Sequence, residues 1–434
     1  MRVLLIHFFS GKLNSKLEFR IENYLNSLKT EIKHYGEIFP WEEIKTIYIW
    51  GGTPNLIWAE NLIMLIEEIK KYFNTESLAE LSFEFNPFPQ EEMYSIVKKI
   101  NEAYAKESRV RFSFGIQSLD DEVLKSAGRP SSFGEIVSFL RWLQEYKQEN
   151  NVFNFDFIAF GKFNETRSGN FQLRDQNKIK FFESFVHSGL ADSFSLYTLE
   201  LSEWSKRFNN LTPLWKGEAE PVAKQGDLLT GDIEKDNLIF EEFQILKEVL
   251  LEAGYHRYEI SNFAHSGKTS IHNMAYRTME NYLWLGLNAS SYLDKEHTKV
   301  LSSFATGRES FRVKEEDHEV VEDFWLRHTN TKDLNKYING ERLNKSSTIE
   351  MTHKDYLIEK FFLKLRTNQW IKDLSEFTEI LVPNYQEKIK NYEKEWFIEI
   401  SSATRDPRPS SLCRLTDAGM DVFNTIVTDL MQEI

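Results

Sequence analysis

The sequence predicts an α/β protein in which short β-strands alternate with helices and build a parallel sheet or partial barrel covered by helices. Two observations lead to this fold class. Six short runs rich in β-branched and aromatic residues recur through the first half of the chain, with amphipathic stretches between them. The runs are nearly all apolar, which is typical of strands covered on both faces. Because such folds bind ligands at the carboxyl ends of their strands, we expect the functional site there.

Six strands and three helices are predicted in the first 253 residues. The predicted strands are Arg2–Phe9, Lys45–Trp50, Glu80–Phe85, Arg109–Gln117, Val152–Phe160 and Ala191–Leu199. Helical patterns cover Asn61–Phe73, Asn177–Ser188 and Leu238–Ala253. The polar, charge-rich stretch between Leu199 and about Asn237 is interpreted as a loop or insertion.

The last third of the chain begins with a second polar tract, residues 294–350, and ends in a compact part. This part has a helical pattern at His353–Thr367, two short strands at Trp396–Ile400 and Leu412–Leu415, and a last helix for which Thr416 is the predicted N-cap. Helices followed by two strands are typical of a winged helix. Such a domain either packs against the rest of the protein or reads DNA, and the acidic composition favours packing.

Composition and charge exclude several functions. The 434 residues are 41% hydrophobic and 14% aromatic, enough for a large core and two or three domains. The formal net charge of −14 and the absence of a basic patch argue against a nucleic-acid partner. No apolar run is long enough for an integral membrane span and the first residues do not resemble a signal peptide, so we expect a cytoplasmic protein. The single cysteine, Cys413, excludes a multi-cysteine metal site within one chain.

Four short motifs stand at the ends of predicted strands. Gly51 and Gly52 follow the second strand, where glycines form either a simple turn or a close approach to a ligand. Glu84 and Asn86 share one face of the third strand in FEFNP, where a carboxylate is either solvated or ligand-binding. The fourth strand ends at Gln117, with Arg129 after the following short helix. The fifth contains Asp156, a carboxylate in an apolar strand that needs either an ion-pair partner or a ligand.

In order and spacing, these motifs resemble a family of the radical S-adenosylmethionine (SAM) superfamily. Together with GYHRYEISNFA (Gly254–Ala264), IHNMAY (Ile271–Tyr276) and WLGLNASSY (Trp284–Tyr292), they are similar to the family of anaerobic coproporphyrinogen III oxidase and the haem chaperone HemW. YEISNF and HN-x-x-Y are features of its HemW branch. The resemblance spans nearly the whole chain.

The resemblance implies a domain organisation. Residues 1–200 are expected to form a partial (β/α)6 TIM-like barrel of the radical SAM type. Residues 201–293 are expected to hold an insertion and the HemW-specific segment, and residues 294–350 a polar connection. Residues 351–434 are expected to form a C-terminal α+β domain resembling a winged helix.

The resemblance also implies a SAM pocket. Its expected residues are Gly51, Gly52, Thr53, Glu84, Gln117, Arg129 and Asp156. The sequence departs from the family at Trp50, where a glycine is common, and in the GKF of Gly161–Phe163, which replaces GLP. The indole of Trp50 is expected to narrow the pocket.

The largest departure is at the first strand. The family follows this strand with cysteines spaced C-x3-C-x2-C, whose thiolates hold a [4Fe–4S] cluster. This chain reads LLIHFFSGKLNSK: His7 is kept, but Ser10 stands near the first cysteine, and lysine, leucine and asparagine follow. We therefore expect no [4Fe–4S] cluster and no radical SAM chemistry, and the distant Cys413 cannot replace the motif.

Haem is the other ligand that the resemblance implies. HemW-like proteins carry an HN-x-x-Y-W motif proposed to bind haem, and this chain has His272, Asn273 and Tyr276 with Arg277 in place of tryptophan. An imidazole can serve as an axial iron ligand, and a guanidinium can pair with a propionate. Without the resemblance, a histidine beside an asparagine is more often a hydrogen-bonded loop residue than a ligand.

Two functions remain open from the sequence. The first is a HemW-like haem-binding protein, a chaperone or regulator, that has lost radical SAM chemistry and retains a SAM pocket. Its partners would be haem or a porphyrin and the proteins that receive haem. The alternative is a radical SAM enzyme similar to oxygen-independent coproporphyrinogen III oxidase. An unrelated activity on the same barrel is a third alternative, although no catalytic triad or carboxylate pair stands out.

Overall fold

The structure is a computed structural model of the chain. It describes residues 3–7, 15–40, 42–51, 57–88, 90–161, 163–165, 171–173, 176–199, 233–305, 325–341, 343–401 and 412–432. These residues group into two compact units, each built from three stretches of the chain. The first unit takes Met1–Phe85, Tyr94–Arg111 and Ser270–Lys364, and the second takes Asn86–Met93, Phe112–Thr269 and Leu365–Ile434.

The strands confirm the predicted α/β class. All six predicted strands are present, with ends that differ from the predicted ones by no more than two residues. The strands are β1 (Val3–His7), β2 (Thr46–Trp50), β3 (Glu80–Phe85), β4 (Arg109–Gln117), β5 (Asn151–Ala159), β6 (Phe163–Glu165), β7 (Phe171–Leu173), β8 (Ser193–Thr198), β9 (His256–Glu259), β10 (Asn262–Ala264), β11 (Tyr282–Gly286), β12 (Ser290–Leu293), β13 (Trp325–Asn330), β14 (Leu343–Met351), β15 (Ile398–Ser401) and β16 (Leu412–Leu415).

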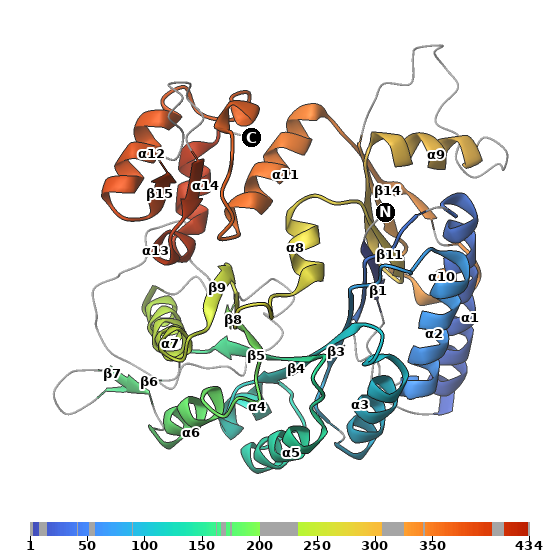
Figure 1. The fold of residues 1–434 in the computed structure, drawn as a ribbon, viewed down its shortest axis with the longest axis horizontal. Helices are drawn as coiled ribbons and strands as arrows, with labels where there is room; N and C mark the ends of the chain where they lie inside the picture. Colours follow the sequence, from blue (N-terminus) through green and yellow to red (C-terminus); the bar gives the residue numbers. More distant parts are fainter. Residues whose placement is uncertain are drawn as a thin grey trace. The chain divides into compact units, whose positions relative to one another are not determined.

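The helices alternate with the first strands, as the amphipathic stretches predict (Figure 1). They are α1 (Ser15–Ile38), α2 (Trp58–Tyr72), α3 (Gln90–Tyr104), α4 (Asp121–Ser126), α5 (Phe133–Tyr146), α6 (Gln176–Val186), α7 (Ile233–Glu252), α8 (Ile271–Arg277), α9 (Lys295–Ala305), α10 (Leu334–Ile338), α11 (His353–Leu365), the 3-10 helix η3 (Leu374–Phe377), α12 (Tyr385–Lys394), α13 (Asp417–Asp421) and α14 (Phe423–Leu430). None of the helices in the described part of the chain is long and apolar enough to cross a membrane.

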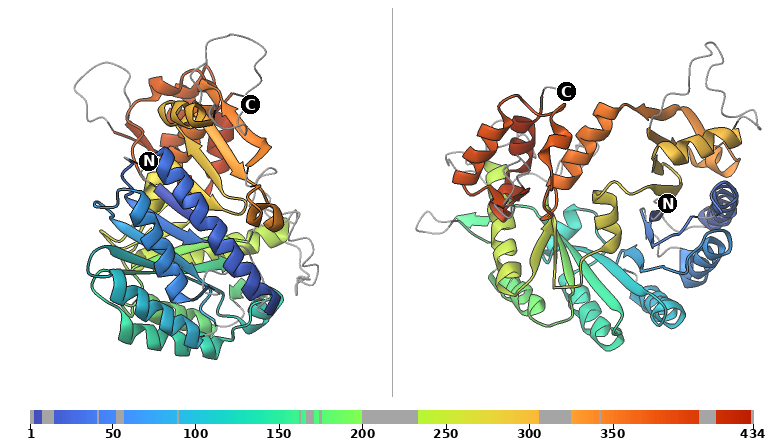
Figure 2. Two further views of the ribbon diagram at one scale, coloured as in Figure 1. Left: turned by 90° about the vertical axis from the view of Figure 1, so that its right-hand side faces the viewer. Right: turned by 45° about the horizontal axis from the view of Figure 1, so that its top comes forward.

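In the first unit, the sheet is centred on β1. Its strand order is β14-β13-β12-β11-β1-β2-β3, and β1 pairs in parallel with β2 and β11, so that Val3 lies opposite both Thr46 and Tyr282. The first four residues of β1 are buried, as expected of a strand flanked on both edges. Helices α1 and α2 pack side by side, and α1 is the long blue helix in the left view of Figure 2.

The end of β11 approaches β1 so closely that only glycine fits there. Gly286 has a φ of +105°, and a Cβ on it would lie 2.5 Å from both the His7 carbonyl oxygen and the Tyr24 hydroxyl. Its backbone N–H donates to the buried carboxylate of Glu31 at 2.9 Å. The WLGLN run therefore fixes the contact between strands that lie far apart in the sequence.

In the second unit, the strand order is β4-β5-β8-β10-β9, with β5 and β8 parallel and β10 antiparallel to both neighbours. Its core is rich in phenylalanine, and Phe114, Phe155 and Phe194 are all buried. Helix α7 packs against β5, β8 and β9. Of the polar residues that the sequence singles out in this unit, Gln117 ends β4 and Asp156 lies in the second half of β5.

The polar tract 294–350 differs from the predicted connection. It contains α9, β13, α10 and β14, and β12, β13 and β14 extend the sheet of the first unit by antiparallel pairing. The burial of β13 alternates residue by residue, because antiparallel strands can leave one face polar. Because β13 contains no continuous apolar run, its sequence does not mark it as a buried strand.

The C-terminal part has the predicted order of helix and strand. Strands β15 and β16 form an antiparallel pair with Ile398 opposite Leu415. Thr416 is the N-cap of α13, and its hydroxyl accepts a hydrogen bond from the Gly419 N–H at 3.0 Å. Both strands and the cap agree with the prediction.

Candidate functional site

The end of β2 carries the first part of the expected SAM pocket. Gly51 has a φ of +83°, a backbone conformation that favours glycine. Gly52 and Thr53 lie outside the described residues, as do Ser10 and the rest of the segment where the cluster cysteines are missing. The indole of Trp50 contacts the His7 ring edge-on, with the ring centroids 5.1 Å apart, and lies 5.4 Å from that of Trp284. An aromatic group therefore stands at the carboxyl end of β2.

Glu84 lies near the end of β3, partly buried, and is not simply solvated. The Tyr48 hydroxyl of the neighbouring strand β2 donates a hydrogen bond to its carboxylate. Both residues belong to the first unit. The Glu84 carboxylate is therefore oriented by a side chain that the sequence analysis did not single out.

The remaining expected pocket residues lie in the second unit, where Asp156 is the best anchored. The Ser113 hydroxyl reaches both Asp156 carboxylate oxygens, at 3.2 and 3.1 Å, and the Asn154 amide donates to one of them at 2.8 Å. Burial lowers the pKa of the nearby Arg129 guanidinium, and the charge of Asp156 opposes this shift. Asp156 and Arg129 therefore interact electrostatically, and the partly buried carboxylate also accepts hydrogen bonds from neutral donors.

Gln117 ends β4 in a strained conformation. Its φ of +68° lies in the left-handed region, which costs a non-glycine residue on the order of 1–3 kcal/mol. Strain of this kind is concentrated at ligand sites. Sequence patterns contain no signal for it.

His272 is not in a loop, so the alternative interpretation of this histidine as a hydrogen-bonded loop residue is wrong. It lies in the first turn of α8, whose N-cap is Ser270, and its side chain is only 3% exposed. Its Nδ1 lies 2.9 Å from the Thr46 hydroxyl, and its ring stacks on that of Tyr48 with the centroids 4.6 Å apart. The imidazole is therefore part of the packed interior of the first unit.

The second ring nitrogen of His272 has no hydrogen-bond partner within the described part of the chain. Nε2 is buried as well as unpaired. Burial, with a smaller effect from the charge of Arg111, lowers the pKa of His272 to about 3, so the imidazole is neutral near pH 7. A neutral imidazole with one nitrogen hydrogen-bonded and the other unpaired has the chemistry of a metal ligand.

A buried carboxylate anchors α8, and the sequence analysis missed it. Glu80, at the start of β3, accepts hydrogen bonds at 3.2 Å from the Ser270 hydroxyl and from the backbone N–H groups of Ile271 and His272. It also pairs with Arg109 at 3.2 Å. The sequence does contain a signal for Glu80: a glutamate in an otherwise apolar strand indicates a buried charge, and a buried charge needs a partner. Glu80 sets the position of the HN-x-x-Y segment.

The rest of this segment lies on α8. The Tyr276 ring lies 4.9 Å from that of Tyr282, and the Arg277 guanidinium lies over the Tyr276 ring at 5.7 Å. Tyr276 and Arg277 are partly exposed, whereas His272 is buried. Asn273 is present at the first turn, where its N–H donates to the Ser270 hydroxyl at 3.2 Å.

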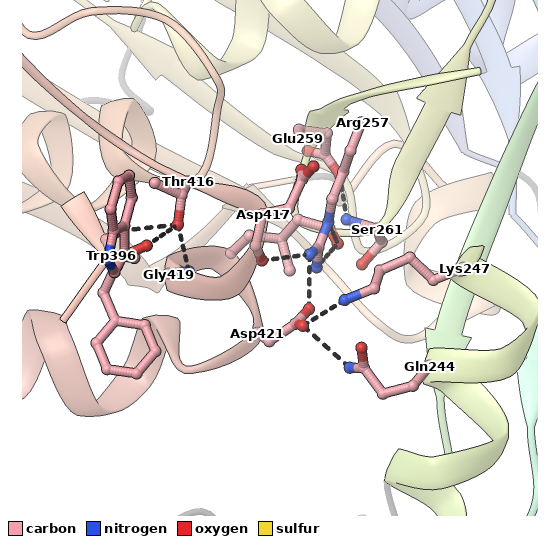
Figure 3. Close-up of polar contacts among 12 residues, drawn as sticks. Gln244, Lys247, Arg257, Glu259, Ser261, Trp396, Thr416, Asp417, Gly419 and Asp421 are labelled. Carbon is pink, nitrogen blue, oxygen red and sulfur yellow. Dashed lines mark hydrogen bonds and ion pairs between the residues drawn. The ribbon is translucent and has the colours of Figure 1, made fainter. Parts of the chain in front are cut away.

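The YEISNF segment forms a tight hairpin in the second unit, shown in Figure 3. Glu259 accepts hydrogen bonds from the Ser261 N–H at 3.3 Å and from the Asn262 amide. The Arg257 guanidinium bonds to the Ile260 carbonyl and, at 2.6 Å, to the Asp421 carboxylate of α13. This motif therefore binds the hairpin to the C-terminal residues and has a structural role in this chain.

The donor set does not fit an iron–sulfur cluster. Cys413 is 2% exposed on β16, and burial raises the pKa of its thiol to about 12, so it is not a thiolate near pH 7. Among the described residues, no group of three or more histidine, cysteine or carboxylate side chains is arranged to hold a metal ion. The chain as a whole has no second cysteine.

Comparison with known proteins gives consistent similarities. A family model for the radical SAM superfamily matches residues 15–166. The chain is 27% identical over 283 residues to the heme chaperone HemW of Bacillus subtilis, covering 64% of this chain and 65% of that protein. It is 24% identical over 410 residues to the heme chaperone HemW of Lactococcus lactis, covering 94% and 88%. The fold is similar to that of coproporphyrinogen III oxidase (HemN) from Escherichia coli, with a TM-score of 0.63 at 16% identity over 99% of this chain and 89% of the other.

Proposed function

We propose that the chain, which is similar to HemW proteins of the radical SAM superfamily, binds haem and delivers it without radical SAM chemistry. The observation that carries the proposal is His272. Its Nδ1 is oriented by Thr46, and its Nε2 is neutral and unpaired among the described residues. The haem-receiving partner and the cytoplasmic location remain predictions from the sequence.

The residues present fit haem better than a cluster. His272 would coordinate the haem iron, and Arg277, partly exposed five residues later, would pair with a propionate. Because the His272 side chain is 3% exposed, α8 or the side chain itself would have to move before Nε2 could coordinate iron. Bound haem would supply the iron that the imidazole coordinates, and the chain's own part is to orient that imidazole through Thr46 and Glu80.

The loss of radical chemistry is supported by the sequence. The reductive cleavage of SAM depends on an iron–sulfur cluster, and one buried thiol cannot hold it. A coproporphyrinogen III oxidase-like activity is therefore the less favoured alternative. Within the second unit, the hydrogen bonds of Asp156 and the nearby charge of Arg129 support a retained site at which SAM binds without being cleaved.

Haem titration tests the role of His272. We expect haem to give a shifted Soret band with the wild type, and His272→Ala to weaken binding at least tenfold, because the coordination bond is lost. Free imidazole should restore the band in that variant. His328→Ala is the matched control, since His328 is equally buried in the same unit, and it should bind haem as the wild type does. Thermal melting is measured to check that both variants fold.

Two outcomes would contradict the proposal. If the wild type gives no Soret shift, the chain is not a haem carrier. If both alanine variants bind haem as tightly as the wild type, the iron ligand is not His272 and the HN-x-x-Y segment is structural.

Calorimetry with SAM tests the retained pocket. We expect binding in the wild type and a loss of at least tenfold in affinity for Asp156→Asn, because the variant removes the negative charge beside Arg129. Glu183→Gln, at an exposed carboxylate on α6, is the control and should bind normally. No heat of binding at millimolar SAM with the wild type folded would mean that Asp156 is kept only for its structural hydrogen bonds.

A further inference from the structure

Tyr48 contacts one residue from each of the two candidate ligand sites. Its hydroxyl donates to the carboxylate of Glu84, and its ring stacks on the imidazole of His272 at an interplanar angle of 28°. The three side chains come from β2, β3 and α8, all within the first unit. Neither the motifs nor the proposed function gives this tyrosine a role.

The packing around Tyr48 leaves little freedom. Tyr48 is 7% exposed and His272 is 3% exposed, and close-packed side chains of this kind shift together. The hydroxyl of Thr46, two residues earlier on the same face of β2, lies 2.9 Å from Nδ1 of the imidazole. The backbone of His272 is fixed to Glu80. Because its backbone is fixed, His272 can adjust to a change in its surroundings mainly by rotation of its side chain.

The hydrogen bond to Glu84 orients the Tyr48 ring. A ligand that brings its own donor to this carboxylate, such as a ribose hydroxyl or an ammonium group, competes with the tyrosine hydroxyl for the same oxygens. When the hydroxyl is displaced, the Tyr48 ring and the imidazole stacked on it shift together, because the two rings are in contact. Binding at Glu84 then changes the environment of Nε2.

We infer that Tyr48 is a positioning residue that couples ligand binding at Glu84 to the orientation of the His272 imidazole. Haem affinity is thus regulated by a ligand that carries hydroxyl or ammonium donors. The inference rests on the proposed function, because it gives that function a regulatory input. By linkage, haem must alter the affinity for the second ligand by the same factor.

The test distinguishes the role of the Tyr48 hydroxyl from the role of its ring. Haem is titrated into the full chain with and without saturating SAM, and the ratio of the two dissociation constants is compared between variants. We expect a ratio of at least about fivefold in the wild type, in either direction, and a ratio near one in Tyr48→Phe. Tyr292→Phe, at a buried tyrosine of the same unit, is the control and should keep the wild-type ratio.

A second measurement needs no ligand. The ring nitrogen resonances of His272 are followed by NMR in protein labelled with nitrogen-15 histidine and assigned with His272→Gln. Tyr48→Phe and Glu84→Ala should shift these resonances in the same direction, whereas Tyr292→Phe should not move them.

The outcomes distinguish this inference from the proposed function. If both ligands bind and the haem affinity is independent of SAM, the coupling is wrong and the haem-binding proposal stands. If Tyr48→Phe keeps the wild-type ratio, the coupling does not pass through this hydroxyl. If haem or SAM does not bind, the NMR measurement decides alone, and unshifted His272 resonances in Glu84→Ala overturn the inference.

Discussion

Replacing Asp421 with asparagine is expected to lower the free energy of unfolding by about 3–5 kcal/mol, because it leaves two buried cations without a counter-charge. The carboxylate pairs with Arg257 at 2.6 Å and with Lys247 at 2.5 Å, and it accepts from the Gln244 amide at 3.0 Å (Figure 3). The side chain of Arg257 is 1% exposed, so water cannot take the place of the lost charge.

Two variants of the same cluster serve as controls. Lys247→Met should cost no more than about 1 kcal/mol, because it leaves Arg257 and Asp421 as a neutral pair. Asp417→Asn, on the same helix, should be neutral, since only its backbone carbonyl accepts from Arg257. Urea denaturation measures all three. Similar losses for Asp421→Asn and Asp417→Asn would show that the ion cluster does not stabilise the protein.

Anaerobic reconstitution with iron and sulfide is expected to leave the protein without a [4Fe–4S] cluster. Three thiolates are required, and the chain has one cysteine, buried on β16. Iron and sulfide analysis and the visible absorption spectrum check the result, with a protein that carries the three-cysteine motif reconstituted in parallel. Cys413→Ser should behave as the wild type does. About four irons per chain with the matching absorption in both proteins would require ligands other than thiolates.

The sequence was a good guide to the parallel strands and a poor one to the antiparallel strands. The apolar runs around β1 to β5 and β8 are buried on both faces, and their composition alone marks them. β13 alternates between buried and partly exposed residues and lies in a tract that is polar on average. β11 is short, and its pairing with β1 depends on residues about 280 positions away, which no local pattern contains.

The candidate site was predictable residue by residue but not in its contacts. Motif order located Glu84, Asp156 and His272, and the structure describes all three. The partners that orient them, Tyr48, Ser113 and Glu80, lie on other elements and have no distinctive spacing. The seven-residue helix α8 was missed because so short a helix is stabilised by the Ser270 cap and by Glu80, not by its own periodicity.

The position of β1 between β2 and β11 has a consequence for synthesis on the ribosome. Its partner β2 emerges soon after it, but β11 ends 279 residues after His7, which at 5–20 residues per second is a delay of roughly 15–55 s. During that interval one edge of an apolar strand, VLLIH, is without its native neighbour. An unpaired apolar strand edge tends to pair with other chains. We therefore expect the nascent protein to be prone to aggregation until β11 has been synthesised. Fast overexpression should therefore favour inclusion bodies, even though β1 is paired on both edges in the finished fold.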